Sequence, residues 1–499
     1  MSTKKILAVL LALFVLATAV SGCGNSGSSS ADSQSGSSAT SENSASTEDT
    51  ASTDGEVPTI SLMVVCGTTP PDADAVAEKL SEITREKIGC NVEFITMEIG
   101  NVAQQLNLLL SGGDDTLDVF MAGISVPYST IVNNGQALSL DTLMEPYAEE
   151  VKTALGEKVY ESGRVNGELY GIGRLLDQAS TTCYNLRRDI AEEFGYKNGD
   201  KVDLAELTEL FGKVREKYPD TPLIGPMNGV PSIGDSRIDS LGNKLGVLDN
   251  YGQDTTVTNY YESAGYEELV GYFKQWKEMG CYMADILNVT DAPIDYIPSG
   301  KAFGCFASHF SAEMNGIWSS QNFGTDIASL QIYEDAVAIT PGAYECINPA
   351  TKNPEAAAAL IYLMATDPDV ENLLINGIEG QHYQVLEDNT ATYVDGKDIS
   401  TTGWCLGYSW TALNSTISIP FEYPADYYDR MLAANKNAQQ SKAFGCQFDL
   451  TGVSDAVSAC TNVVNQYENA LSGGAVEDFD ATLAQFQQGP VSYTHLTLP

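Results

Sequence analysis

Basic residues are scarce in this sequence, and histidine is nearly absent. Lysine and arginine together number 26 against 67 aspartate and glutamate residues, and the formal net charge is −41 at pH 7. Recognition of nucleic-acid phosphates requires clustered lysine and arginine side chains. The composition therefore excludes nucleic acid as an expected partner, and it is typical of an acidic surface that aids solubility.

Metal-ligand patterns are also missing. The chain has three histidines, no H-E-x-x-H motif, and no cysteine pair spaced as in a zinc knuckle. Asp367, Asp369 and Glu371 resemble part of a calcium loop, but Pro368 interrupts them and no glycine takes the sixth position. A helix start is the better interpretation of that stretch. No phosphate-loop motif occurs either, so we expect no metal and no cofactor.

Long apolar runs are confined to the first 23 residues. Two lysines precede the apolar run from Ile6 to Val20, and the sequence Val20-Ser21-Gly22-Cys23 resembles the bacterial lipobox. We expect residues 1–22 to be a lipoprotein signal peptide that is removed, leaving Cys23 as the lipidated, palmitate-bearing N-terminus. The mature protein is then expected on the extracellular face of the cell membrane, held by its lipid anchor. An ordinary secretory signal with a chance cysteine is the alternative.

Aromatic residues are absent from the stretch that follows the anchor. Residues 24–56 consist almost entirely of Ser, Gly, Ala, Thr, Asp and Glu, and such a composition cannot bury enough apolar surface to fold. As a flexible coil, these 33 residues have a root-mean-square span of roughly 30 Å. Residues 23–56 are therefore predicted to tether a folded body close to the membrane.

The remaining chain alternates strand and helix patterns. The stretches Thr59–Val65, Asn91–Met97 and Leu117–Met121 are β-rich, and between them two helices are predicted, the first from an N-cap at Asp72 to a stop at Gly89. This alternation indicates a mostly parallel α/β sheet. An Asn-Gly pair at 166–167 predicts a hairpin. Later helices are predicted at Leu204–Lys217, Tyr266–Met279, Pro354–Met364, Pro368–Asn376 and Val453–Leu471.

Several motifs, taken in their order, carry a resemblance to a known family. They are Asn166–Ile172, Cys183–Asp189, Pro298–Gly304, Asn353–Leu360 and Asn376–Tyr383. In order and spacing they resemble the extracellular solute-binding proteins of ABC transporters, of the maltodextrin-binding type (family 1). Within that family the chain is most similar to the long lipoproteins of Gram-positive bacteria, and the resemblance covers about residues 57–488.

The resemblance implies an α/β architecture with a two-lobed, periplasmic-binding-protein-like fold of type II, whose discontinuous lobes are joined by a hinge. Lobe 1 is expected to comprise residues 57–175 and about 341–400, and lobe 2 about 176–340 and 401–488. Such a protein is not an enzyme. It is expected to capture a small polar solute, here an oligosaccharide, by hinge closure, and to pass it as a monomer to the permease subunits of the transporter.

Candidate ligand contacts follow from the chemistry of sugars, whose apolar faces stack on aromatic rings and whose hydroxyls bind carboxylates and amides. Ser125 and Tyr128 follow the third strand, where open α/β sheets place their ligands. Asp177 and Gln178 lie at the first crossing between the lobes. The other candidates are His309 and Phe310, which follow a strand beginning at Ala302, and the Gly-rich cluster of Trp404, Tyr408 and Trp410.

Core packing is the competing interpretation for each of these candidates. For Trp276, which shares an apolar helical stripe with Leu269 and Phe273, core packing is favoured.

The alternative functions are a surface glycoside hydrolase or other carbohydrate-active lipoprotein, which needs two positioned carboxylates, and a passive adhesive lipoprotein. Residues 489–499 break the preceding helical pattern and resemble translated adapter sequence, so they are predicted to be a non-native tail.

Nine cysteines besides Cys23 occur at wide spacings, mostly within apolar runs. An odd number in such positions is not typical of a secreted disulfide framework, and buried free thiols are expected. Titration of the denatured, unreduced protein with a thiol reagent should therefore detect most of them. Fewer than about six reactive thiols would contradict this expectation.

Overall fold

The computed structural model describes residues 57–111, 115–227, 233–242, 244–289, 291–333, 335–404, 412–448 and 452–494 of the 499-residue chain. The predicted signal peptide, Cys23 and the predicted tether lie outside these ranges. Among the described helices, none combines the length and the apolar character that crossing a membrane requires.

The first lobe is built on a five-stranded sheet of order β2-β1-β3-β11-β6. β1 (Thr59–Cys66), β2 (Asn91–Glu98) and β3 (Val119–Ala122) are parallel, as the alternating pattern predicts. β11 (Tyr344–Ile347) returns from far along the sequence and lies antiparallel between β3 and β6 (Gly171–Gly173). The sheet is thus completed by a strand that follows the whole of the second sheet in sequence.

Alternation along β1 builds an apolar layer on each face of this sheet. Ile60, Leu62 and Val64 pack into a cluster with α2 (Ala73–Ile88), α14 (Pro354–Thr366) and α15 (Pro368–Asn376), whereas Met63 and Val65 pack with α3 (Val102–Ser111). α2 ends at Gly89, which adopts the left-handed conformation with φ 71°, as expected for a glycine C-cap. The predicted hairpin is confirmed between β4 (Arg164–Val165) and β5 (Glu168–Leu169).

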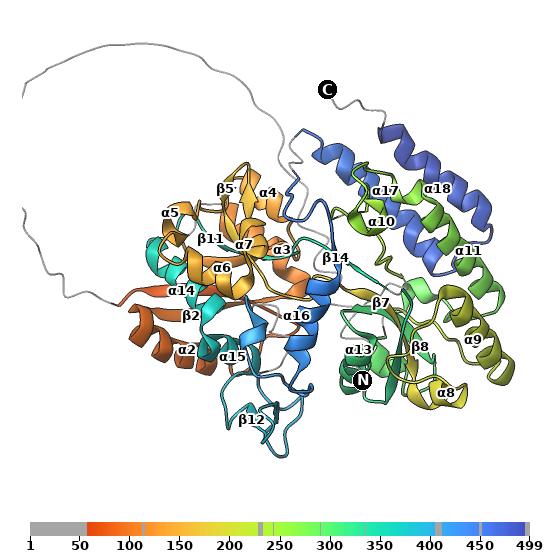
Figure 1. Ribbon diagram of the computed structural model, residues 1–499, viewed down its shortest axis with the longest axis horizontal. Helices are drawn as coiled ribbons and strands as arrows, with labels where there is room; N and C mark the ends of the chain where they lie inside the picture. Colours follow the sequence, from red (N-terminus) through yellow and green to blue (C-terminus); the bar gives the residue numbers. More distant parts are fainter. Residues whose placement is uncertain are drawn as a thin grey trace, which may run out of the picture. The chain divides into compact units, whose positions relative to one another are not determined.

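The second lobe is built on a three-stranded antiparallel sheet. β7 (Thr181–Arg187) lies between β8 (Gly304–His309) and β9 (Ile327–Gln331). Its core takes in α9 (Leu204–Lys217), α11 (Ala264–Glu278), α17 (Ser454–Ser472) and α18 (Phe479–Thr494), of which α17 and α18 pack side by side (Figure 1). Trp276 is fully buried in this core, as predicted, and its Nε1–H donates to Thr208 Oγ1 at 2.9 Å.

The five later predicted helices are confirmed, two of them, α9 and α15, with the expected bounds and the other three within two residues. Asp367 caps α15 by accepting the N–H groups of Asp369 and Val370, so the helix-start interpretation of that acidic stretch is confirmed. The side-chain cap expected from Asp72 is wrong, because its carboxylate makes no cap bond and instead contacts the side chains of His382 at 3.0 Å and Gln381 at 3.2 Å. The expected break of the helical pattern at residue 489 is wrong, because α18 continues to Thr494, whereas the origin of residues 489–499 stays a prediction.

The last segment of lobe 1 extends beyond residue 400, where its end was expected. Trp404 and Leu413 belong to the apolar cluster of the first lobe, and the N–H of Leu175 donates to Leu413 O at 2.9 Å. β14 (Gln439–Gln440) then pairs with β10 (Val337–Ala338) beside the second sheet. The segment after Leu413 still packs on lobe 1, since Asn376 Nδ2 donates to Ile419 O at 2.9 Å and Phe421 packs with Tyr383 and Ala391. We therefore propose that the chain leaves lobe 1 after Phe421.

Eight cysteines fall within the described ranges, and all eight are free. Seven are buried, and Cys446 is exposed. The expectation of buried free thiols is thus confirmed for those seven, and Cys405 lies outside the described residues.

Replacing Trp276 by alanine should lower the unfolding free energy by about 3–5 kcal/mol, because a fully buried indole leaves a large cavity. Trp318→Ala provides the control, since Trp318 is only partly buried at the edge of a smaller cluster. Denaturant unfolding followed by circular dichroism measures both. A loss no greater for Trp276→Ala than for Trp318→Ala would contradict the assignment of Trp276 to the core.

Candidate functional site

The crossing segment 174–180 leaves one sheet and enters the other at edges where strand ends gather. In the first sheet the parallel strands β1, β2 and β3 end at one edge, and β11 begins there. In the second sheet β7 begins at Thr181, which pairs with His309 at the end of β8, and β9 also ends there. Open α/β sheets bind ligands beyond the carboxyl ends of their strands. These two edges and the segment between them therefore form the candidate site.

Five residues meet at the second edge, and we call them the crossing cluster: Asp177, Gln178, His309, Tyr423 and Tyr427. The rings of Tyr423 and Tyr427 are stacked, with centroids 4.0 Å apart and an interplanar angle of 20°. The Tyr427 ring also lies 6.3 Å from the His309 ring. All five residues are partly exposed, although the side-chain nitrogen of Gln178 is itself buried.

Asp177 contributes a carboxylate that is held only by neutral donors. The Ser180 hydroxyl donates to Oδ2 at 2.9 Å, and backbone N–H groups of Asp177 and Phe310 also stabilise its charge. Burial has the larger effect and raises the pKa of the Asp177 carboxyl. Burial is also the main cause that raises the pKa of Tyr423 and Tyr427, and the nearby charge of Asp177 adds to it.

His309 and Gln178 supply neutral hydrogen-bonding groups. Burial lowers the pKa of His309 to about 4, so its ring is neutral at pH 7. Its Nδ1 accepts the N–H of Ser311 at 3.3 Å, which assigns the proton to Nε2 and makes Nε2–H a donor. The side-chain nitrogen of Gln178 is buried and has no hydrogen-bond partner among the described residues. An amide in that state is suited to a ligand acceptor.

The helix α16 (Tyr427–Asn437) holds the crossing segment in place. Asn435 Oδ1 accepts the N–H of Gln178 at 2.8 Å, and Asn435 Nδ2 donates to Leu176 O at 2.7 Å. Sequence reasoning missed Tyr423, Tyr427 and Asn435. The signal available for the tyrosines was the aromatic run from Phe421 to Tyr428 ahead of a helix.

The structure brings together Asp177, Gln178 and His309 of the predicted contacts, with Phe310 behind them. Phe310 is buried against Met314 and Met431, and its ring meets Tyr427 edge-on at 5.3 Å. It thus supports the cluster from within the protein. Ser125 lies partly exposed just after β3, at the edge of the first sheet.

Two other predicted contacts are core residues. Tyr128 is buried, stacks on Tyr344 with centroids 4.1 Å apart, and donates its hydroxyl to Gly163 O at 2.6 Å. Trp404 is buried in the core of lobe 1, and its Nε1–H donates to Leu374 O at 3.3 Å. We therefore withdraw both as ligand contacts. Tyr408 and Trp410 lie outside the described residues.

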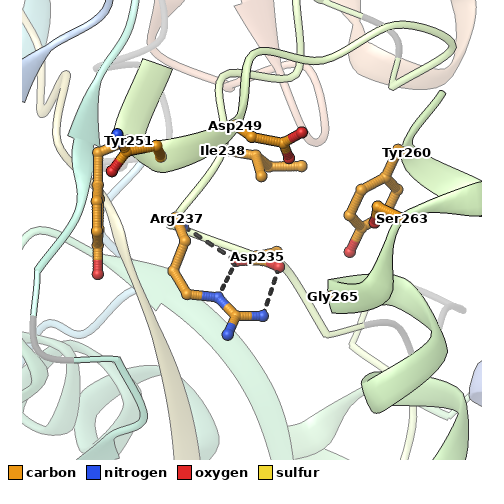
Figure 2. A pocket seen from close by; sticks show the side chains of 9 residues that line it. Asp235, Arg237, Ile238, Asp249, Tyr251, Tyr260, Ser263 and Gly265 are labelled. Atoms are coloured by element: carbon orange, nitrogen blue, oxygen red, sulfur yellow. Dashed lines mark hydrogen bonds and ion pairs between the residues drawn. The ribbon is translucent and has the colours of Figure 1, made fainter. Parts of the chain in front are cut away.

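A pocket of about 240 Å³ opens on the second lobe, and we call it the arginine pocket (Figure 2). Arg237 forms a two-pronged ion pair with Asp235, at 2.9 Å for both Nε–Oδ1 and Nη2–Oδ2. The remaining lining residues are Ile238, Asp249, Asn250, Tyr251, Tyr260, Ser263 and Gly265.

The arginine pocket lies along the same sheet edge as the crossing cluster. Gly234 O accepts the hydroxyl of Thr182, the second residue of β7, at 2.8 Å. The Arg237 guanidinium lies 4.5 Å from the ring centre of Tyr333, two residues beyond the end of β9. Neither this pocket nor the crossing cluster resembles a metal site, and within the described ranges no three His, Cys, Asp or Glu side chains gather to hold a metal.

Comparison with known proteins finds relatives along most of the chain. A family model described as a domain of unknown function (DUF3502) matches residues 442–489. A protein of Streptococcus pneumoniae named carbohydrate ABC transporter substrate-binding protein is 22% identical over 440 residues, covering 86% of this chain and 86% of the relative.

Solved structures with similar folds also match the chain over most of its length. The N-glycan transport solute-binding protein NgtS of Streptococcus pneumoniae has a TM-score of 0.72 at 19% identity, covering 88% of this chain and 99% of its own. A solute-binding protein from Bifidobacterium longum infantis, described as HMO-binding and associated with an ABC transporter, has a TM-score of 0.56 at 15% identity, covering 87% and 97%. The chain therefore has the two-lobed, type II α/β fold, and the resemblance of its sequence to the extracellular solute-binding proteins of ABC transporters is confirmed.

Proposed function

We propose that this protein is a solute-binding protein that captures an oligosaccharide and delivers it to the permease of an ABC transporter. The fold and the relatives support the transport role, since the Streptococcus pneumoniae relative is named for carbohydrate and NgtS has been solved in complex with Man1GlcNAc. The crossing cluster supports the choice of ligand, because it combines stacked rings with the Asp177 carboxylate, the neutral His309 ring and the Gln178 amide nitrogen, which has no hydrogen-bond partner among the described residues.

The observation that carries the proposal is the complementarity of the crossing cluster to a sugar. A hexose has apolar C–H faces that stack on rings such as Tyr423 and Tyr427. Its hydroxyls donate to a carboxylate and accept from amide and imidazole N–H groups, which Asp177, Gln178 and His309 provide. Because these residues lie at the segment that joins the two lobes, a bound sugar would contact the hinge directly and favour closure.

Binding without hydrolysis is the better interpretation of this site. A glycoside hydrolase needs two carboxyl groups facing the scissile bond, and the crossing cluster contains one, Asp177. Of the two carboxylates that line the arginine pocket, Asp235 is engaged by Arg237, and Asp249 accepts the hydroxyl of Thr258 at 2.7 Å. We therefore propose that the protein is not an enzyme.

The remaining features of the proposal concern location and partners. We propose that Cys23 carries a lipid anchor and that residues 23–56 tether the binding body on the extracellular face of the membrane. A tether raises the effective concentration of the binding protein at membrane partners, which suits delivery to a permease. We propose that the protein acts as a monomer.

A panel of neutral oligosaccharides of two to five units should raise the melting temperature of the purified protein, because a ligand that binds only the folded state stabilises it. Tyr427→Ala should reduce this shift by removing one of the stacked rings. Tyr362→Ala is the matched control, since Tyr362 stacks with Tyr147 at 4.6 Å away from both sheet edges. No shift across the panel, or chromatographic detection of hydrolysis products, would contradict the proposal.

Asp177→Asn should stabilise the unliganded protein at pH 7 while weakening oligosaccharide binding. The pKa of Asp177 is raised in the folded state, so ionisation opposes folding above the unfolded pKa of about 3.9. The gain in stability of Asp177→Asn over the wild-type protein should therefore be present at neutral pH and disappear as the pH falls below about 4. Melting temperatures between about pH 3 and 8, with isothermal titration at pH 7, measure both effects. A variant that is less stable and binds equally well would show that Asp177 is a structural residue.

A further inference from the structure

Asp235 occupies an anion-binding position in the arginine pocket. The Arg237 guanidinium presents two parallel N–H groups to the two Asp235 oxygens, the geometry with which arginine binds carboxylates and phosphates. The Asp235 side chain is 2% exposed. A Cβ placed on Gly265, in the first turn of α11, would lie 3.8 Å from Asp235 Oδ2, so the carboxylate also lies close to the positive end of that 15-residue helix.

Without Asp235, this arrangement would attract an acidic group of a ligand. With Asp235 present, the position is filled by a carboxylate of the protein itself. A second carboxylate, that of Glu268, lies 3.5 Å from Arg237 Nη1. Arg237 is therefore enclosed by negative charge on two sides.

No other cation lines the pocket. Arg237 is the single lysine or arginine among the nine lining residues. Lys442, whose backbone N–H donates to Gly252 O, is exposed and does not line the pocket.

The walls of the pocket suit an uncharged ring. Tyr251 and Tyr260 stand on opposite sides, with Arg237 and Asp235 between them (Figure 2). Tyr251 is partly exposed, whereas Tyr260 is buried in the core of lobe 2, so Tyr251 is the ring that a ligand can contact. Tyr251 has a left-handed backbone with φ 55°, and its N–H donates to Arg237 O at 2.7 Å. A bulky residue held in that conformation is uncommon and occurs where the surrounding structure enforces it, often at ligand sites.

We infer that the arginine pocket is a second subsite, which takes one uncharged sugar unit, and that Asp235 excludes acidic sugars by occupying the place of their carboxylate. The inference rests on the proposed oligosaccharide binding and adds to it a ligand class and a specificity-determining residue. An acidic unit entering the pocket would meet the carboxylates of Asp235 and Asp249, with Arg237 already paired to Asp235 and Glu268.

The test compares neutral oligosaccharides with counterparts oxidised only at C6, such as manno- and mannurono-trisaccharides, by isothermal titration. The wild-type protein should bind the acidic member at least about tenfold more weakly, because like charges at close range cost roughly that factor. Asp235→Asn should reduce the ratio of neutral to acidic affinity about tenfold, because it frees Arg237 to pair with the ligand carboxylate. Asp291→Asn, which breaks the exposed Lys301–Asp291 pair at 2.7 Å on the same lobe, should leave it unchanged.

Two further variants make the outcome decisive. Glu268→Gln should narrow the ratio in the same direction and decides the question if Asp235→Asn does not fold, since Glu268 is half exposed. Tyr251→Asn, which tolerates the left-handed backbone, should weaken neutral binding about three- to tenfold through loss of a ring contact. Any one of three results would overturn the inference. They are equal affinity of the wild-type protein for the neutral and acidic members, an unchanged affinity ratio in both charge variants, and unchanged affinity of Tyr251→Asn for the neutral member. Absence of binding to every neutral sugar would instead overturn the proposed function.

Discussion

Arg174 is the residue on which the joining of the two lobes depends. Its backbone N–H donates to Ala343 O at 3.2 Å, and its guanidinium Nε–H donates to Ala412 O. This buried residue thus ties the first crossing segment to the second, which ends at Ala343 just before β11, and to the lobe 1 segment that contains Ala412 and Leu413. Burial lowers the pKa of Arg174 to about 10 and raises the pKa of Glu345 and of Glu371 to about 8, and the attraction between the guanidinium and the two carboxylates opposes these shifts. A buried charge left without compensation is strongly destabilising, so this charged group ties the crossing segments to one place.

The crossing cluster exists because the crossing segments are held together. Asp177 and Gln178 follow Arg174 by a few residues, whereas Tyr427 is contributed by α16 and His309 by the end of β8. The bonds of Asn435 to Leu176 and Gln178 fix α16 against the first crossing. The site therefore combines one strand end, one helix and one hinge segment. A ligand bound there contacts the elements whose relative rotation closes such proteins.

Local patterns predicted the secondary structure well because they report local physics. The Asn-Gly hairpin, the Gly89 helix stop and the bounds of α9 and α15 depend on backbone conformation and short-range periodicity. Burial of aromatic residues could not be predicted in the same way. Trp404 and Tyr128 follow Gly-rich or strand-end positions typical of ligand contacts, yet tertiary neighbours far away in sequence enclose them.

The site residues also divide into those that the sequence predicts and those that depend on tertiary packing. Asp177 and Gln178 could be predicted because the family resemblance placed the crossing. Asn435 and Tyr427 could not, since their role depends on where α16 docks. Asp72 shows the same limit on a smaller scale, because a residue in the N-cap position turned its carboxylate to a distant histidine.

The order of strands has a consequence for how the chain acquires its structure. β11 enters the middle of the first sheet only after the entire second sheet has been synthesised, and Phe486 of α18 packs against Tyr261 more than 200 residues earlier. Contacts between such distant residues are slow to form, because a long loop must close before they contribute stability. Each lobe therefore remains incomplete until much later segments emerge, and the folding rate of the whole is set by these long closures.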